Sequence, residues 1–334
     1  MTLRPGKLPA SLLSGLLAQP GPLPDAVLLG PAIGEDACAI ELPASVLVVA
    51  TDPITLTGRE IGRYAVTVNA NDVAVTGATP RWFLATILLP PGTTEEDVRS
   101  VFAGIRHALS EANIVLVGGH TEVTGAVNQP VVVGQMLGLA GDRGVVKTGG
   151  VHSGDVVVQV GRAPVEGAAV LAAEASVRLT HLDGKVRRAA REALDQPGIS
   201  VVGAALLAAR LGSTAMHDPT EGGVAGGLHE MAAASGVRLE VDRSQMLWWG
   251  PAIAICEAVR ADPWATLASG TLLAAFDASV GDGAIEAFSA AGYEAAVIAK
   301  ANRGSGVVDT SARVIPWPER DEVSRVLAEA RWLS

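Results

Sequence analysis

An α/β (α+β) fold of two domains is predicted from three features of this sequence. The chain has 334 residues, and one domain usually contains about 100–200. Apolar, β-branched runs alternate with segments of helical periodicity in both halves. Between the halves, residues 140–154 contain five glycines, a composition typical of a connection between domains. We therefore expect an N-terminal domain at 1–145 and a C-terminal domain at 146–334.

The first half predicts strands and helices in alternation. The clearest helix is 94–112, which has an apolar stripe and begins with Thr94 and Asp97 in the pattern of a capping box. The helix at 59–77 is ended by Gly77 and then Pro80. In chain order, the expected strands are 46–51, 82–89, 114–117 and 131–139, and the expected helices are 59–77 and 94–112.

The second half repeats this alternation. Its strands are short apolar runs, and its helices are rich in alanine and leucine. Gly236 follows the third helix in the position that commonly ends helices. In chain order, the expected strands are 155–160, 237–241 and 271–276, and the expected helices are 165–175, 201–211, 222–234 and 252–260.

Charge and composition exclude several classes of protein. The formal net charge is −10, and no cluster of Lys and Arg suggests nucleic-acid binding. No apolar run reaches the ~20 residues that cross a membrane. Residues 8–17 are interrupted by Pro9 and Gly15, which favours a short amphipathic helix over a secretory leader. Two thiols, Cys38 and Cys256, fit a reducing cytoplasm, where we expect this protein.

A glycine loop at 30–36 is the first segment that could carry chemistry. Gly30 and Gly34 permit a ligand to approach the backbone, and its amides could hold an anion. Glu35 and Asp36 could hold a cation. The segment is no Walker A loop, because no Gly-Lys-Ser/Thr follows, and an ordinary surface loop is the alternative.

Carboxylates follow in the next strand and helix. Asp52 ends an expected strand, where ligands of α/β proteins collect, although a turn aspartate explains it equally well. Asn69 and Asp72 are three residues apart on one helix face. Valines surround them, and a carboxylate in apolar surroundings needs a partner or a metal. A solvent-facing position is the alternative.

Two further clusters follow apolar runs. One cluster comes directly after an expected strand and comprises Gly118, Gly119, His120, Thr121 and Glu122. It offers backbone amides, a base, a hydroxyl and a carboxylate. A decorated β-turn is the alternative.

The segment 217–223, His-Asp-Pro-Thr-Glu-Gly-Gly, opens a helix, whose first amides and dipole suit phosphate. Capping by Asp218 or Thr220 would need no ligand. His217 and Glu221 are weaker candidates for a chemical role.

Together these clusters favour a Mg-nucleotide enzyme without a P-loop. They supply the carboxylates of Asp36, Asp52 and Asp72 and glycine-rich segments for anions. Mg²⁺ takes oxygen ligands and often accompanies nucleotide phosphates. Motifs of zinc proteases, serine hydrolases and dinucleotide-binding folds are missing from the sequence.

In this order, the motifs resemble the AIR-synthase-related (PurM-like) superfamily, and within it the HypE branch of hydrogenase-maturation proteins. The most characteristic stretch is 68–80, Val-Asn-Ala-Asn-Asp-Val-Ala-Val-Thr-Gly-Ala-Thr-Pro, and the loops at 30–37 and 217–223 also match. The resemblance implies an N-terminal sheet domain that dimerises as a barrel and a C-terminal α/β domain. It implies ATP and Mg²⁺ as cofactors, and an acceptor oxygen activated by phosphoryl transfer.

The resemblance also assigns roles to residues. Mg²⁺ would be held by Asp36, Asp52 and Asp72, and Asp218 matches a further aspartate of the nucleotide site. His120 and Glu122 are the candidates for general base. The expected nucleotide contacts are Gly34, Glu35, Asn69, Gly118, Gly119, Thr121, Thr220, Gly222 and Gly223.

This sequence departs from the HypE pattern at two places. It ends Arg331-Trp332-Leu333-Ser334, without the terminal cysteine that carries the carboxamide in HypE. His120 stands where many relatives have aspartate. We therefore expect a HypE-like branch acting on an unidentified small-molecule or protein-borne acceptor. A non-catalytic nucleotide-binding scaffold is the alternative.

Overall fold

The computed structural model describes residues 24–30, 32, 34–35, 37–58 and 60–331. The expected helix at 8–17 and the candidate ligand Asp36 lie outside the described residues. Internal contacts divide the chain into two compact units. One contains residues 23–30 and 36–145, and the other contains 31–35 and 146–334. Residues 31–35, which we expected in the N-terminal domain, thus belong to the C-terminal unit.

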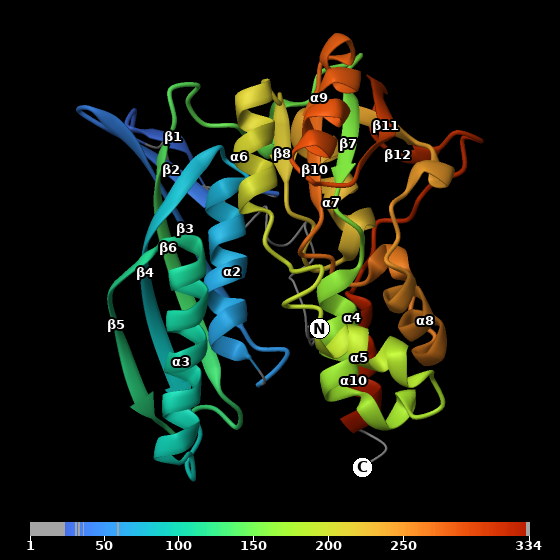
Figure 1. Ribbon diagram of the computed structural model, residues 1–334. Coiled ribbons are helices and arrows are strands. Elements are labelled where there is room, and N and C mark those ends of the chain that lie inside the picture. The colour runs from blue at the N-terminus through green and yellow to red at the C-terminus, as the bar shows by residue number, and fades with distance from the viewer. Residues whose placement is uncertain (1–23, 31, 33, 36, 59, 332–334) are drawn as a thin grey trace, which may run out of the picture. The chain divides into compact units, whose positions relative to one another are not determined.

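The N-terminal unit is a six-stranded open sheet with strand order β1-β2-β3-β6-β4-β5 (Figure 1). All of its pairs are antiparallel except β4 with β5. Its strands and helices are β1 (Val27–Leu29), β2 (Ala37–Leu42), β3 (Ser45–Ile54), α2 (Ile61–Ala74), β4 (Ala78–Leu89), α3 (Glu95–Ala112), β5 (Val115–Val123) and β6 (Val131–Ala140).

Helix α2 packs directly on the middle of this sheet. Twelve of its fourteen residues are buried, so it is a core helix with no wide polar face. On β6, a Cβ at Gly134 would come within 2.3 Å of Asn69 Nδ2, and one at Gly138 within 2.5 Å of Val73. Glycine at these two positions therefore lets α2 lie against the strand.

Helix α3 covers α2 and begins as the sequence predicts. Thr94 and Asp97 form the expected capping box: the Asp97 amide donates to Thr94 Oγ1 at 3.2 Å, and the Thr94 amide donates to Asp97 Oδ2 at 2.8 Å. The helices cross at Gly62, where a Cβ would lie 2.4 Å from the carbonyl oxygen of Val101. A larger residue at this crossing would force the helices apart.

The C-terminal unit contains a second six-stranded sheet, in the order β12-β9-β11-β7-β10-β8. Only β12 and β9 pair in parallel. The strands are β7 (Val156–Val160), β8 (Ala215–His217), β9 (Val237–Val241), β10 (Leu272–Phe276), β11 (Ala295–Arg303) and β12 (Gly306–Asp309).

Helices cover both faces of this sheet. Helix α7 packs Val224, Leu228 and Met231 against one face, while α6 and α9 lie on the other. Helices α4, α5, α8 and α10 pack on one another (Figure 1). The helices are α4 (Val165–Glu174), α5 (Gly184–Arg191), α6 (Val202–Leu211), α7 (Gly223–Ser235), α8 (Gly250–Val259), α9 (Ala278–Ala290) and α10 (Glu322–Arg331), and the short 3-10 helices are Thr148–Gly150, Ser176–Leu179, Arg243–Gln245 and Pro263–Ala265.

The mixed α/β class is confirmed, and several element boundaries differ from expectation. The strand expected to end at residue 117 continues to Val123, so Gly118 and Gly119, for which a β-turn was the alternative, lie within the strand. Strands β1, β2, β8, β11 and β12 and helices α5, α9 and α10 were not predicted. Most are short or lack a clear apolar period, so the sequence alone does not reveal them.

Candidate functional site

Asn69 joins α2 to β3. Its Nδ2 donates to the carbonyl oxygens of Asp52 at 3.2 Å and Ala65 at 2.9 Å, and its Oδ1 accepts from the Asp52 amide at 2.8 Å. Its side chain is fully buried. In this arrangement Asn69 fixes the backbone of Asp52, the position at which the sequence predicts a metal ligand.

Asp52 and Asp72 lie on elements that pack together, β3 and α2. Asp52 is half-buried, and Asp72 is only 4% exposed, one turn of helix after Asn69. Their carboxylates have the oxygen chemistry that Mg²⁺ prefers. Among the described residues, however, no three His, Cys, Asp or Glu side chains gather as a metal site. The described residues thus do not by themselves form the expected Mg²⁺ site, and Asp36 is not among them.

The segment 118–122 lies on β5, at the edge of the N-terminal sheet. Asp52 is paired with Gly134, Gly134 with Ala85, and Ala85 with Gly119, so Asp52 and Gly119 share one row. Three strand spacings of about 4.8 Å separate them by roughly 14 Å. Within one chain, Asp52 and the 118–122 segment are therefore too far apart to bind one ion.

His120 and Glu122 lie side by side on β5. His120 Nε2 is 3.4 Å from Glu122 Oε2, and both side chains are exposed. The structure thus pairs the two candidates for general base with each other, at an open edge. Thr121 is also exposed.

The C-terminal unit brings two predicted clusters together. Strand β8 ends at His217, which is 1% exposed and pairs through Nε2 with Glu230 Oε2 of α7 at 2.8 Å. A Cβ at Gly34 would lie 3.2 Å from the Cβ of Glu230. Glu35 Oε2 accepts from the Thr148 amide at 3.5 Å. Part of the glycine loop therefore lies beside α7, near the fully buried Asp218.

The start of α7 differs from the expected phosphate site. The Gly222 amide donates to Asp321 Oδ2 at 2.8 Å, and the Gly223 amide donates to the carbonyl oxygen of Thr220 at 3.0 Å. A Cβ at Gly223 would lie 2.6 Å from the carbonyl oxygens of Trp264 and Thr266. The expectation that these two amides are unpaired is wrong, because both donate hydrogen bonds to oxygens of the protein.

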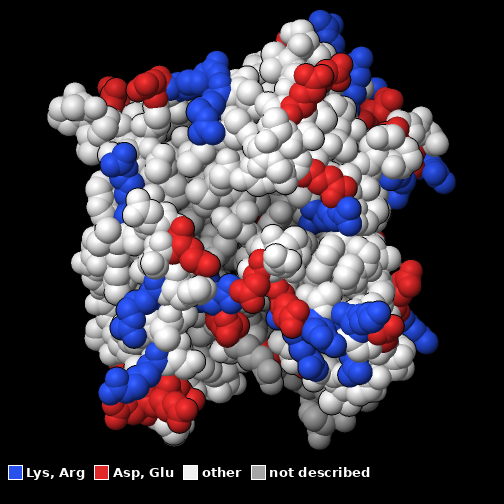
Figure 2. All heavy atoms as spheres, in the orientation of Figure 1, with Lys and Arg blue, Asp and Glu red and all other residues white. Residues whose placement is uncertain are grey.

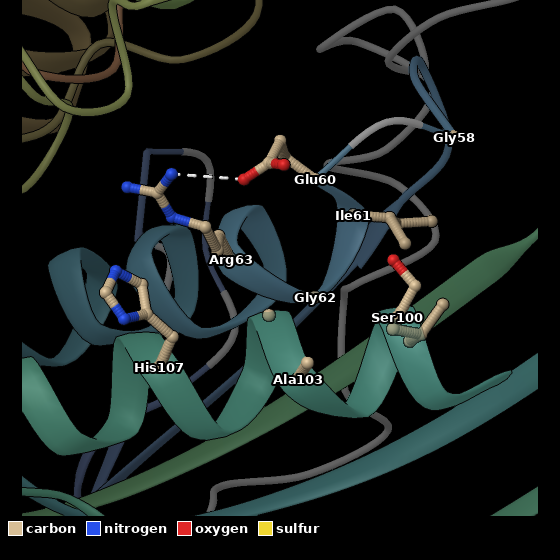
Figure 3. A pocket seen from close by; sticks show the side chains of 10 residues that line it. Gly58, Glu60, Ile61, Gly62, Arg63, Ser100, Ala103 and His107 are labelled. Atoms are coloured by element: carbon tan, nitrogen blue, oxygen red, sulfur yellow. Dashed lines mark hydrogen bonds and ion pairs between the residues drawn. The ribbon is translucent and has the colours of Figure 1, made fainter. Parts of the chain in front are cut away.

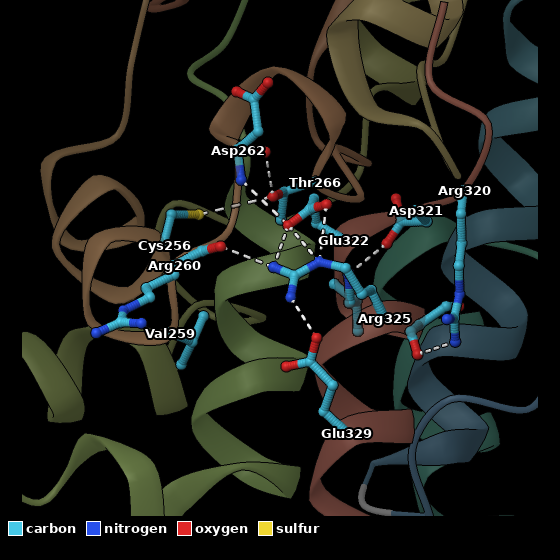
Figure 4. Close-up of polar contacts among 12 residues, drawn as sticks. Cys256, Val259, Arg260, Asp262, Thr266, Arg320, Asp321, Glu322, Arg325 and Glu329 are labelled. Carbon is cyan, nitrogen blue, oxygen red and sulfur yellow. Dashed lines mark hydrogen bonds and ion pairs between the residues drawn. The ribbon is translucent and has the colours of Figure 1, made fainter.

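The residues around Asp321 were missed by the sequence analysis (Figure 4). Asp321 is 3% exposed, and burial raises its pKa to about 7. The available signal was that Asp321 directly precedes α10. Such an aspartate predicts a cap for that helix, but not a hydrogen bond to the start of another helix. Nearby, burial raises the pKa of Cys256 to about 11, so this thiol is a poor nucleophile at neutral pH.

A cavity of about 290 Å³ lies between α2 and α3 (Figure 3). Arg63, Ser100 and His107 contribute polar groups to its wall, and Arg63 is paired with Glu60 at 3.0 Å. None of the predicted site residues lines it. On the face shown in Figure 2, acidic and basic side chains are interspersed.

Two family models match this chain. AIR synthase related protein, N-terminal domain, matches residues 34–140, and the corresponding C-terminal domain matches residues 152–310. The chain belongs to the AIR synthase related family. This membership confirms the resemblance on which the site assignments rest.

Curated relatives of this family member include hydrogenase-maturation proteins. The chain is 29% identical over 266 residues to carbamoyl dehydratase HypE of Cupriavidus necator, a match that covers 76% of this chain and 72% of that protein. It is 27% identical over 215 residues to a hydrogenase expression/formation protein of Methanocaldococcus jannaschii, covering 63% of this chain. That match spans 60% of the M. jannaschii protein.

Solved structures share the two-unit fold of this family. The crystal structure of Escherichia coli HypE has a TM-score of 0.72 at 21% identity, covering 95% of this chain and 98% of that one. HypE in complex with ATP has a TM-score of 0.67 at 20% identity, covering 94% and 91%. A chain of the HypE–HypF complex has a TM-score of 0.71 at 23% identity, covering 84% of this chain and 93% of that one. In the described part of the chain, no helix is long and apolar enough to span a membrane.

Proposed function

We propose that this member of the AIR synthase related family is an ATP-dependent enzyme that activates an acceptor oxygen by phosphoryl transfer. The observation that carries the proposal is the match of both halves to the family models. HypE relatives are named carbamoyl dehydratases, and one structural neighbour is in complex with ATP. The acceptor would be a carboxamide, an amide or a similar oxygen on a small molecule or protein.

The proposed roles follow from charge and position. Asp52 and Asp72, with Asp36, would hold Mg²⁺, which offsets phosphate charge when bound. Asn69 would position Asp52 through its backbone bonds. In the C-terminal unit, buried Asp218 and the adjacent Thr220, with Gly34 and Glu35 beside α7, would contact the nucleotide.

The proposed chemistry is mainly positioning. Phosphoryl transfer needs an acceptor aligned with the transferred group and stabilised charge on that group. His120 is the better candidate to take the acceptor proton, because histidine is the commonest general base and the Glu122 carboxylate at 3.4 Å can orient its ring. Gly118, Gly119 and Thr121, on the same strand as His120, would contact the nucleotide.

The decisive experiment is calorimetric titration of ATP into the purified protein, with and without Mg²⁺, followed by an acceptor screen for ADP release. We expect Mg²⁺-dependent binding near one ATP per chain. Asp72→Asn should abolish turnover, whereas Asp142→Asn, at an exposed aspartate of the same unit, should leave it unchanged. Undiminished turnover in Asp72→Asn would overturn the metal assignment.

A nucleotide-binding maturation scaffold is the second candidate. It is favoured by His120 pairing with Glu122 on an exposed strand. A scaffold would bind ATP and release no ADP with any acceptor. Calorimetry combined with the ADP assay therefore separates the two candidates.

We also propose that the protein is a homodimer. All nine residues of edge strand β5 are exposed, including Val115, Val117 and Val123. A long apolar edge strand is a template for pairing with another chain. A protein partner is a further possibility for the acceptor, since one neighbour is a chain of the HypE–HypF complex.

A further inference from the structure

One carboxylate in the C-terminal unit caps two helices. Asp321 Oδ1 accepts from the Val323 amide at 2.8 Å, in the first turn of α10. Asp321 Oδ2 accepts from the Gly222 amide at 2.8 Å, at the start of α7. The first amides of a helix have no partner within the helix. Asp321 therefore supplies acceptors to two helix starts that lie about a hundred residues apart in the chain.

The α10 side of this contact is held by an ion-pair network (Figure 4). Arg325 pairs with Glu322 at 2.5 Å and with Glu329 at 2.7 Å, and donates to the carbonyl oxygen of Arg260 at 2.7 Å. Glu322 also accepts from the Asp262 amide at 3.2 Å. The network fastens α10 to the end of α8, and so fixes the position of Asp321.

The α7 side of this contact is the loop 218–223. Gly223 packs so closely on Trp264 and Thr266 that a Cβ would lie 2.6 Å from both carbonyl oxygens. Thr266 Oγ1 in turn donates to the carbonyl oxygen of Asp262 at 2.7 Å. The loop is therefore held from one side by backbone packing and from the other by the Asp321 carboxylate.

From this geometry we infer that Asp321 is a positioning residue, which couples the C-terminal helix α10 to the loop 218–223. The coupling itself rests on these contacts alone. Its consequence for nucleotide binding rests on the proposed function, which places Asp218 and Thr220 in the ATP site. Movement of α10 would then change the affinity for ATP without any contact between α10 and the nucleotide.

Hydrogen exchange of the full-length protein without ATP tests the coupling directly. In Asp321→Asn one of the two accepting oxygens is replaced by an NH2 group, which cannot accept, so one cap is lost, and we expect amides of the peptide 219–226 to exchange about tenfold faster. Arg325→Ala keeps the carboxylate but loosens α10, and should accelerate the same peptide. Asp277→Asn makes the same chemical change at the cap of α9, where Asp277 accepts from the Ser279 amide at 2.9 Å, and should leave the peptide unchanged.

Unchanged exchange of this peptide in both Asp321→Asn and Arg325→Ala would overturn the inference. If Asp321→Asn does not fold, Arg325→Ala alone decides. ATP calorimetry then separates the two proposals. Weaker ATP binding in Asp321→Asn, by about tenfold, with Asp277→Asn like wild type, supports the role in nucleotide binding. Equal ATP binding by wild type and Asp321→Asn overturns that role. Absence of ATP binding in the wild type, with faster exchange in the variants, overturns the proposed function and leaves the coupling standing.

Discussion

At the scale of single residues, buried polar side chains set the geometry of the candidate site. Asn69 lies in the buried layer of α2, with Asn71 and Asp72, and supplies both a donor and an acceptor to the Asp52 backbone. A buried amide is costly unless its hydrogen bonds are made. The sequence analysis expected Asn69 to contact the nucleotide, and that role stays a prediction. The structure adds a reason for asparagine that needs no ligand.

Asn69→Ala should therefore destabilise the protein even without ATP. The substitution leaves the Asp52 amide without its acceptor and creates a gap beside Gly134. We expect a loss of about 2–3 kcal/mol in the free energy of unfolding, measured by urea denaturation. Asn128→Ala, at an exposed position of the same unit, should change it by less than about 0.5 kcal/mol. Equal effects of the two substitutions would contradict the bridging role.

Asp321 should make stability depend on pH. Burial raises its pKa from 3.8 to about 7, so the folded state binds a proton more tightly than the unfolded state. Its stabilising contribution is complete below about pH 4 and is lost as the pH rises to about 7. Three units of pKa correspond to at most about 4 kcal/mol.

Chemical denaturation between pH 4 and 8 measures this effect. The slope of unfolding free energy against pH should be shallower in Asp321→Asn than in wild type, because the titrating group is gone. Asp277→Asn, which removes a fully exposed carboxylate, is the control and should keep the wild-type decline over the upper part of this range. Parallel profiles for wild type and Asp321→Asn would show that Asp321 does not titrate in this window.

At the scale of elements, close packing decides where helices and strands meet. Helices α2 and α3 cross at Gly62, which has no room for a side chain. The strand expected to end at residue 117 instead continues to the end of β5, because residues up to Val123 pair with β4. Local sequence favours a turn at Gly-Gly, and pairing with a neighbouring strand overrides that preference.

Gly62→Ala should separate α2 from α3. Its Cβ would lie 2.4 Å from the Val101 carbonyl oxygen, so we expect destabilisation of about 1–3 kcal/mol. Gly283→Ala is the matched control, since Gly283 is also within a helix and has nothing within 4 Å of its Cβ position. That control should gain up to about 1 kcal/mol from helix propensity. Thermal unfolding of both variants measures the contrast, and a stabilised Gly62→Ala would refute the close crossing.

Edge strand β5 should carry the dimer contact. Val117→Lys places a charge on this strand, and we expect it to shift the protein from dimer toward monomer by at least about tenfold in dissociation constant. Light scattering after size-exclusion chromatography over a concentration series measures the shift. Val177→Lys, at a valine 84% exposed in the C-terminal unit, should leave the oligomer unchanged. A Val117→Lys variant that remains as dimeric as wild type would place the contact elsewhere.

At the scale of the whole molecule, the predicted site residues are divided between the two compact units. Asp52, Asn69 and Asp72 belong to the N-terminal unit, while Gly34, Glu35 and Asp218 belong to the C-terminal one. The chain's own residues in either unit do not complete a metal site among those described.

Mg-ATP should raise the unfolding temperature of the protein. At a ligand concentration one hundred times its dissociation constant, the expected stabilisation is about 2.7 kcal/mol. Removal of the metal with EDTA should abolish most of it, because the phosphate charge would no longer be offset near carboxylates. Differential scanning calorimetry with and without EDTA measures both effects. An ATP-induced rise that survives EDTA undiminished would argue against Mg²⁺.

Much of the fold was predictable because its elements carry local signals. The capping box before α3, the glycine after α7 and the apolar runs of β3, β4 and β6 each act within a few residues of sequence. Family membership was predictable from motifs such as 68–80, whose residue types and order are unusual in combination. Elements without such signals, including β8 and β12, were missed because tertiary contacts stabilise them rather than their own propensity. Helix α5 was missed although Asp183 caps it by accepting from the Lys185 amide.

The sequence by itself determined the fold class, the family and the residues on which the candidate site is built. Tertiary structure alone decided how those residues are used. In the folded chain Asn69 is hydrogen-bonded to the Asp52 backbone, and Gly34 lies beside Glu230. The Gly222 amide donates to Asp321, about a hundred residues away. The physical reason is that every buried polar group must find a partner, and that partner is chosen by proximity in space, which local sequence does not encode.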